Sequence, residues 1–157
     1  MRTLIVALLA IALALPSAAL ATKNLDDGVA LKGFDAVSFF DGVPRMGRKA
    51  ILFEHQGATY RFYNDANRKR FAREPSLYTP AFGGFCAWGI LDDSDHEDIS
   101  PGSWKIVDGK LLLFYKGYLG DGLRDWSAHA SENGGDIATL QNANIVWSRL
   151  QGNPEPE

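Results

Sequence analysis

An unbroken apolar run near the N-terminus decides how much of this chain is available to form a folded domain. The run covers residues 4–15, and Arg2 is the only charged residue before it. Behind it, Ala19-Leu20-Ala21 matches the small-x-small pattern of a signal-peptidase site. A run of 12 residues is short against the ~20 that a membrane-spanning helix needs. We therefore predict a cleaved secretory signal peptide at residues 1–21.

The remaining residues are enough for one domain with a modest apolar core. We expect this domain to span residues 22–150, followed by a flexible tail at 151–157 that contains two prolines. Without its first 21 residues the chain has 15 basic and 19 acidic side chains, a net charge of −4. Such a domain is a poor nucleic-acid binder, and no later apolar run is long enough to span a bilayer. These features predict a soluble exported protein, either periplasmic or secreted.

Two β-hairpins are indicated by turn residues between β-prone segments. The first joins residues 50–55 to residues 58–63 through Gln56-Gly57. The second joins residues 104–107 to residues 110–115 through Asp108-Gly109, a pair that suits a type I′ turn because both of its residues adopt positive φ. A further short strand is expected at residues 33–40, GFDAVSFF.

Three helices are indicated by caps, charge order and apolar spacing. Asn64 is a candidate N-cap for a helix that ends before Pro75. A second helix is expected at residues 123–130 and a third at residues 136–150. Apolar residues of the third helix recur three to four positions apart, which places them on one face: Ile137, Leu140, Ala143, Trp147 and Leu150. Residues 75–90 are expected to be irregular, and the fold class is α+β, with small hairpins and helices packed on them.

A single cysteine, Cys86, excludes an internal disulfide, although small exported domains often contain several. It lies in PAFGGFCAWG at residues 80–89, between the aromatic residues Phe85 and Trp88. Apolar surroundings raise the pKa of a thiol and favour an inert cysteine. The same shelter would suit Cu(I), a soft ion that prefers thiolate ligands. The residues alone leave both interpretations open.

Five carboxylates flank His96 in LDDSDHEDIS at residues 91–100. A mixture of carboxylate and imidazole can hold a divalent metal ion. The segment lacks the glycine and terminal glutamate of an EF-hand loop, and its composition favours a solvated acidic loop. His55, before the first hairpin turn, and His129, near a helix end, are explained by exposure and by the helix dipole. The spacing supports no zinc-protease, serine-hydrolase or phosphate-loop motif.

Four stretches together carry a family pattern. They are GFDAVSFF at 33–40, HQGATYRFYNDANRKRFAREPSLYTPAFGGFCAWG at 55–89, SWKIVDGKLLLFY at 103–115, and the closing region 126–147. The chain resembles exported bacterial proteins of the YHS-domain family, and GGFCAWG at 83–89 is the most diagnostic match. Some members of that family carry selenocysteine at the position of Cys86. The resemblance therefore implies a chemically active sulfur there, within a small YHS-type α+β domain.

YHS domains are often linked to metal handling, and above all to copper. Their metal-binding form resembles DPVCGM followed by YxFCSxxC, but here Ser38, Tyr63 and Asn67 stand where its three cysteines would be. The metal function does not carry over on those positions, which leaves Cys86 as the only soft ligand. One thiolate is too few for a closed structural zinc site.

We predict a periplasmic metal-handling accessory protein, with copper as the metal and Cys86 and His96 as its ligands. Its expected partners are that metal ion and a periplasmic protein. One alternative is a redox protein with Cys86 as the reactive thiol, which requires an external resolving thiol. Another is an interaction module without chemistry, and we do not favour an enzyme.

Overall fold

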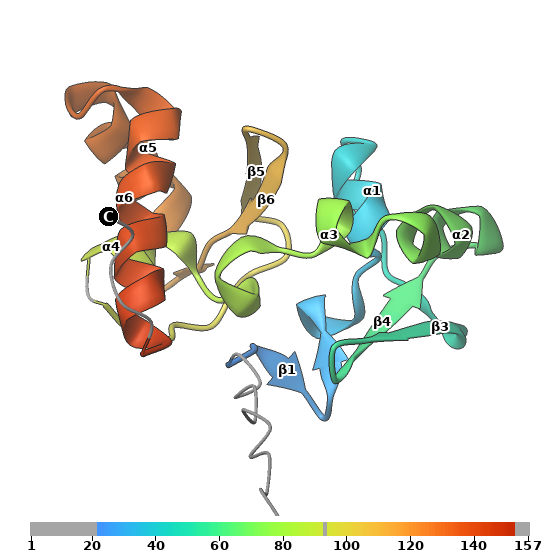
Figure 1. Ribbon diagram of the computed structural model, residues 1–157. Helices are drawn as coiled ribbons and strands as arrows, with labels where there is room; N and C mark the ends of the chain where they lie inside the picture. The colour runs from blue at the N-terminus through green and yellow to red at the C-terminus, as the bar shows by residue number, and fades with distance from the viewer. Residues whose placement is uncertain (1–21, 93, 153–157) are drawn as a thin grey trace, which may run out of the picture.

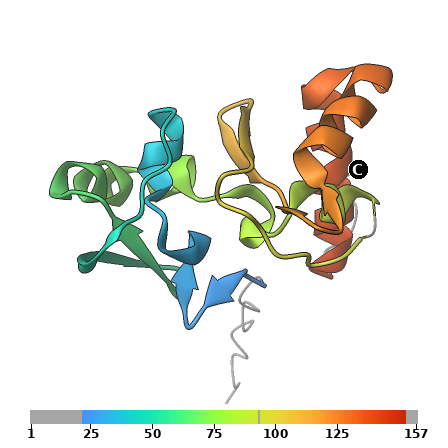
Figure 2. The same cartoon turned by 180° about the vertical axis from the view of Figure 1, so that it is seen from behind.

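The computed structural model describes residues 22–92 and 94–152. The predicted signal peptide, Asp93 and most of the predicted tail lie outside the described residues. Figure 1 shows small sheets with packed helices, so the predicted α+β class is confirmed. Two halves are visible in Figures 1 and 2: residues 24–78 form one, and residues 81–150 form the other.

The first half contains a four-stranded sheet with the order β1-β2-β4-β3. Its strands are β1 (Leu25–Asp26), β2 (Val29–Ala30), β3 (Arg48–His55) and β4 (Ala58–Phe62). The β3–β4 hairpin confirms the first predicted hairpin, and its turn residues Gln56 and Gly57 have φ values of 48° and 77°. Alternate residues of β4 are buried, which turns one face of the sheet to the core.

Residues 33–40 correct a sequence prediction, because they form a helix where we expected a strand. A 3-10 turn η1 (Leu31–Gly33) leads to helix α1 (Ala36–Phe40). The side chain of Asp35 accepts hydrogen bonds from the backbone N–H groups of Val37 and Ser38 and so caps the helix. The cap stabilises helical backbone in a segment whose β-prone side chains favour a strand.

Helix α2 (Asp65–Arg73) confirms the predicted helix and its cap, since Asn64 Oδ1 accepts from Asn67 N at 2.8 Å. Beyond it, the segment predicted to be irregular contains three short helices instead. They are α3 (Pro75–Tyr78), η2 (Ala81–Gly84) and α4 (Ala87–Asp92). Pro75 begins α3 at the helix position that proline favours.

The second half contains two short hairpins and two longer helices. Strands β5 (Trp104–Val107) and β6 (Lys110–Leu113) form the second predicted hairpin, with Asp108 and Gly109 both at positive φ. Strands β7 (Lys116–Gly117) and β8 (Gly120–Asp121) lead to helices α5 (Gly122–Glu132) and α6 (Gly135–Leu150). Both predicted helices are confirmed. The predicted apolar face of α6 is only partly correct, because Ile137 is 56% exposed while Leu140 and Ala143 are buried.

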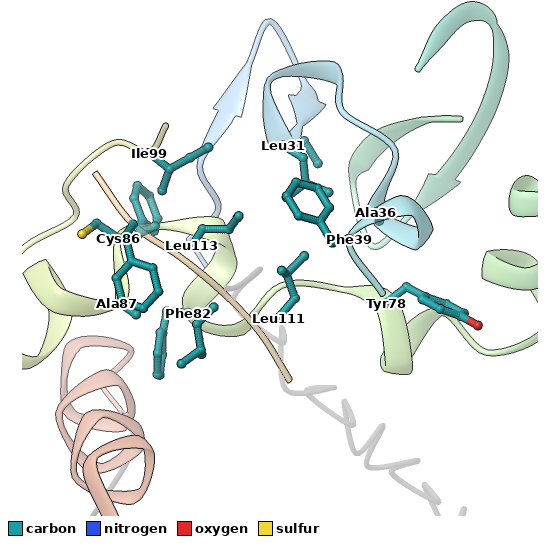
Figure 3. Packing of buried hydrophobic residues seen from close by; sticks show 14 of the residues in the cluster. Leu31, Ala36, Phe39, Tyr78, Phe82, Cys86, Ala87, Ile99, Leu111 and Leu113 are labelled. Carbon is teal, nitrogen blue, oxygen red and sulfur yellow. The ribbon is translucent and has the colours of Figure 1, made fainter. Parts of the chain in front are cut away.

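One apolar core connects the two halves. Strand β6 contributes three consecutive buried leucines, Leu111 to Leu113, and Figure 3 shows Leu111 and Leu113 between Phe39 of the first half and Cys86 of the second. Among the described residues, no helix has both the length and the apolarity to cross a bilayer.

Candidate functional site

Cys86 is a core residue in this fold. It lies between η2 and α4, it is 0% exposed, and it forms an isolated parallel bridge with Leu113. Its backbone N–H donates to the carbonyl oxygen of Glu97 at 2.9 Å, which ties the acidic loop to this position. Packing, and not access to solvent, therefore defines the position of the only cysteine.

The Cys86 thiol is in close contact with backbone groups of Gly89, Tyr115 and Gly122. Its Sγ accepts hydrogen bonds from the backbone N–H groups of Tyr115 at 3.3 Å and Gly89 at 3.5 Å. A Cβ atom at Gly122 would lie 3.1 Å from this sulfur. Burial raises the pKa of Cys86 to about 11, and the nearby Glu97 carboxylate acts in the same direction against the two N–H groups. The thiol therefore stays protonated at neutral pH.

His96 packs among aromatic rings. Its imidazole lies edge-on to Phe85, with centroids 4.7 Å apart, and to Trp147 at 5.7 Å. Its Nε2 atom is buried and has no hydrogen-bond partner. The loop that carries His96 lies beside Cys86, because the Cys86 N–H donates to the carbonyl oxygen of Glu97. The contacts of the His96 ring are with Phe85 and Trp147.

One carboxylate of the acidic loop at residues 91–100, that of Asp98, is paired within the fold. Asp98 forms an ion pair with Lys32 at 2.6 Å and accepts a hydrogen bond from Asn24 at 3.0 Å. These partners hold the pKa of Asp98 below its usual value against the opposing effect of burial. Within residues 22–92 and 94–152, no group of three or more His, Cys, Asp or Glu side chains is placed to hold a metal ion. Copper binding by Cys86 and His96 stays a prediction.

The other two histidines lie in different surroundings. His129 packs against Trp88 at 5.7 Å in the second half. His55 packs edge-on to Phe71 at 5.9 Å, at the end of β3. His55 also lines a hollow between the two halves, and this hollow is the feature that sequence reasoning missed.

This hollow is an open cleft of about 510 Å³ between the β3–β4 turn, the α3–η2 segment, the β5–β6 turn and helix α6. Its apolar lining comes from Pro75, Pro80, Ala81, Phe82, Leu140 and Trp147, and its polar lining from His55, Gln56, Ser76, Thr79, Lys110 and Asn144. A second hollow of about 240 Å³ shares Pro80, Phe82 and Trp147 with it and adds Lys23 and Tyr60. The volume of the cleft lies in the range of small-molecule sites, which are mostly apolar with a few polar groups.

The wall of the cleft has unusual backbone geometry. Phe82 adopts left-handed backbone with φ 53°, which is uncommon for a bulky residue, and Gly83 follows at φ 61°. A Cβ atom at Gly83 would lie 2.3 Å from the carbonyl oxygen of Thr22, so only glycine fits there. This close approach holds the N-terminal segment against η2 and presents Phe82 to both hollows. Strained backbone of this kind is concentrated at ligand sites.

The charges around the cleft contrast with those of the chain. The chain has 19 acidic against 16 basic residues, yet the described lining of the two hollows contains Lys110 and Lys23 and no carboxylate. Lys110 is exposed and lies at the start of β6, and Lys23 Nζ donates to the carbonyl oxygen of Gln56. The hollows therefore combine aromatic surface with positive charge.

Comparison of the chain with protein-family models, with curated proteins and with solved structures finds no match in any of the three. The resemblance to YHS-domain proteins thus stays a prediction from the residues.

Proposed function

We propose that this protein is a non-catalytic binding protein whose cleft holds a small amphipathic anion. The observation that carries the proposal is the lining: apolar walls with Lys110 in the cleft and Lys23 in the adjoining hollow, and no carboxylate among the described lining residues, in a chain of net negative charge. The apolar body of such a ligand packs on Phe82 and Trp147. Its charged group lies toward Lys110, where the cation attracts it.

Polar side chains at the mouth of the cleft fit the same ligand class. Ser76 and Asn144 are exposed and can donate hydrogen bonds to an anionic oxygen, whereas the Thr79 hydroxyl already donates to the carbonyl of Pro75. Convergent donors of this kind orient a ligand that apolar contact alone would hold loosely.

Two buried titratable groups, Cys86 and Tyr60, favour binding over catalysis at their own positions. A nucleophile or general acid-base group needs a pKa close to the working pH. Burial instead raises the pKa of Cys86 to about 11 and that of Tyr60, beside the cleft, to about 12. These shifts argue against a redox role for Cys86, because a reactive thiol needs a lowered pKa.

The test is calorimetric titration with 8-anilinonaphthalene-1-sulfonate, an anion with an aromatic body, using two matched variants of α6. Asn144 lines the cleft, whereas Asn142 is also exposed on α6 and does not line it. We expect one-to-one binding by the wild type and by Asn142→Trp, and at least tenfold weaker binding by Asn144→Trp, which is about 1.4 kcal/mol. Equal affinity of the two variants, or no saturable binding by the folded wild type, would contradict the proposal.

A copper-handling role in the periplasm is the second candidate, as the resemblance to YHS-domain proteins implies. One observation favours it, namely the buried Nε2 of His96 that has no hydrogen-bond partner. The Cys86 thiol would have to lose its proton and its shelter to serve as the other ligand. Titration with Cu(I) under reducing conditions tests this: binding of one equivalent by the wild type, lost in both Cys86→Ser and His96→Phe, would support the site. Binding that both variants retain would remove it.

A further inference from the structure

Positive charge is concentrated in one part of this acidic chain. Residues 43–73 contain eight basic and two acidic side chains, a net charge of +6, whereas the rest of the chain has eight basic and seventeen acidic ones. This stretch includes β3, β4 and α2, which lie together in the first half (Figure 1). Such charge separation attracts oppositely charged partners to one face.

Two arginines of this stretch flank an exposed tyrosine. The guanidinium carbons of Arg45 and Arg48 lie 4.9 and 5.3 Å from the centre of the Tyr63 ring. Neither arginine has a carboxylate partner among the ion pairs of the described residues. Val43 and Met46 lie beside them in the chain and are each 55% exposed. We call these five residues the arginine surface.

A hollow of about 360 Å³ opens within this surface. Val43, Arg45 and Tyr63 line it together with the polar residues Ser38, Asn64 and Asn67 and with Asp41, whose carboxylate is already paired with Arg70 at 3.0 Å. Cations and exposed apolar groups are thus joined to a concave site with hydrogen-bonding capacity. Arginine and tyrosine are also the residues that most often carry the energy of protein interfaces.

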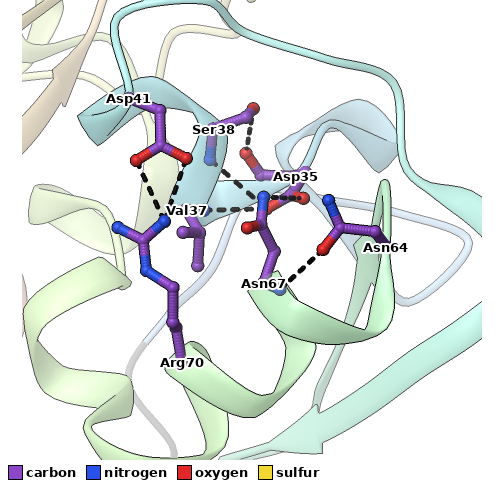
Figure 4. A network of polar contacts seen from close by, with 7 residues as sticks. All are labelled: Asp35, Val37, Ser38, Asp41, Asn64, Asn67 and Arg70. Atoms are coloured by element: carbon purple, nitrogen blue, oxygen red, sulfur yellow. Dashed lines mark hydrogen bonds and ion pairs between the residues drawn. The ribbon is translucent and has the colours of Figure 1, made fainter.

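Asp35 lies at the centre of a hydrogen-bond network next to this surface, and Figure 4 shows its contacts with Val37, Ser38 and Asn67. Its buried carboxylate accepts hydrogen bonds from Tyr63 N at 2.9 Å and from Asn67 Nδ2 at 2.7 Å. Its backbone N–H donates to the carbonyl of Arg45 at 2.9 Å, and the hydroxyl of Ser38 accepts from Arg45 N at 2.9 Å. The segments that carry Arg45 and Tyr63 are therefore fixed before any partner arrives, which reduces the entropic cost of binding.

The geometry points to a docking site for an acidic segment of a partner protein, with carboxylates beside an apolar side chain. The carboxylates would pair with Arg45 and Arg48, where arginine offers two parallel donors. The apolar side chain would pack on Val43 and Tyr63. Charge complementarity selects this occupant, because the surface is basic and its two guanidinium groups have no carboxylate partner within the part of the chain that the structure describes.

Other occupants fit this surface less well. A large polyanion such as an anionic bilayer would also face the seventeen acidic residues outside residues 43–73. A short acidic segment meets the net positive charge of residues 43–73, and the carboxylate that lines the hollow, Asp41, is paired with Arg70. A second copy of the chain would have to offer its own acidic loop, where Asp98 is already paired with Lys32.

The experiment is fluorescence anisotropy with a labelled nine-residue peptide that carries acidic residues on both sides of a phenylalanine. The variant Arg45→Gln/Arg48→Gln is compared with Lys116→Gln/Arg124→Gln, which removes the same charge from exposed residues of the second half. We expect binding that weakens with salt, a loss of at least tenfold in the first variant, and a change below twofold in the second. Circular dichroism confirms that both variants are folded.

Several results would overturn the proposal. They are equal binding by the two double variants, and equal binding of a peptide in which serine replaces every acidic residue. Arginine-dependent binding to phosphatidylserine vesicles, or arginine-dependent self-association, would also do so if the acidic peptide does not bind. Because the arginines are on the surface and the thiol and cleft lie elsewhere, loss of this site leaves the proposed cleft function untouched.

Discussion

Asp35 and Cys86 are both completely buried, and the two halves of the molecule are organised around them in opposite ways. Asp35 is surrounded by donors, and its two oxygens accept four hydrogen bonds from Val37, Ser38, Tyr63 and Asn67. Cys86 packs in the apolar core with the Glu97 carboxylate near its thiol, and it receives two weaker bonds to sulfur. Asp35 has no ion-pair partner among the described residues.

The contrast shows that the more reactive side chain of the two is not the one with the more specific structural role. The cysteine has the more reactive side chain, yet burial keeps its thiol protonated, and the residue packs as part of the apolar core. The aspartate connects a helix cap, a strand end and a loop, so its side chain determines local backbone structure. This contrast supports the proposal that the cleft, and not the only thiol, carries the function.

Removal of the Asp35 carboxylate should have the largest effect on stability. Asp35→Ala leaves four donors without their acceptor, and an unsatisfied buried donor costs about 1–3 kcal/mol. We expect the free energy of unfolding in urea to fall by about 4 kcal/mol. Asp41→Ala is the control, because its exposed ion pair with Arg70 is worth at most about 1 kcal/mol. Similar losses in the two variants would remove the special position of Asp35.

Alkaline pH should weaken the second half through Cys86. The folded protein holds the thiol proton more tightly, because the pKa rises from an ordinary value of 9.0 to about 11. This contribution is fully present below pH 9 and is lost as the pH rises toward 11. Unfolding at several pH values should show a loss of about 2 kcal/mol in the wild type beyond that in Cys86→Ala. Parallel curves for the two proteins would mean that the thiol is not sheltered.

A smaller effect tests the packing around the sulfur. A methyl group at Gly122 would lie 3.1 Å from Cys86 Sγ and 3.3 Å from Trp88 Cβ. Gly122→Ala should therefore destabilise the wild type, and Cys86→Ala should partly relieve this by removing the sulfur. We expect a coupling energy of about 1 kcal/mol in the double-mutant cycle. Additive effects would show that the two residues do not press on each other.

The sequence correctly predicted the two hairpins and helix α2, because their turns and cap are determined by residues adjacent in the chain. Gln56-Gly57 and Asp108-Gly109 impose positive φ and fix the two hairpins. Asn64 caps α2 as expected. Residues 33–40 were predicted wrongly, because the strand pattern of Val37 and Phe39 outweighed the cap that Asp35 supplies. Its other bonds, to Tyr63 and Asn67, depend on the folded chain.

The cleft could not be predicted, because its lining comes from segments that are far apart in sequence. His55, Phe82, Lys110 and Trp147 show no common motif, and only the meeting of the two halves brings them together. Cys86 drew attention in the sequence because it is unique. Its burial was indicated by its aromatic neighbours, but the raised pKa required the fold.

The most direct test of this account is one titration of the fluorescent anion 8-anilinonaphthalene-1-sulfonate into the wild type, Cys86→Ala and Asn144→Trp. If function lies in the cleft, the cysteine variant binds within twofold of the wild type, and Asn144→Trp binds at least tenfold more weakly. If the folded Cys86→Ala protein loses binding while Asn144→Trp retains it, the thiol and not the cleft is the functional centre, and the account is wrong.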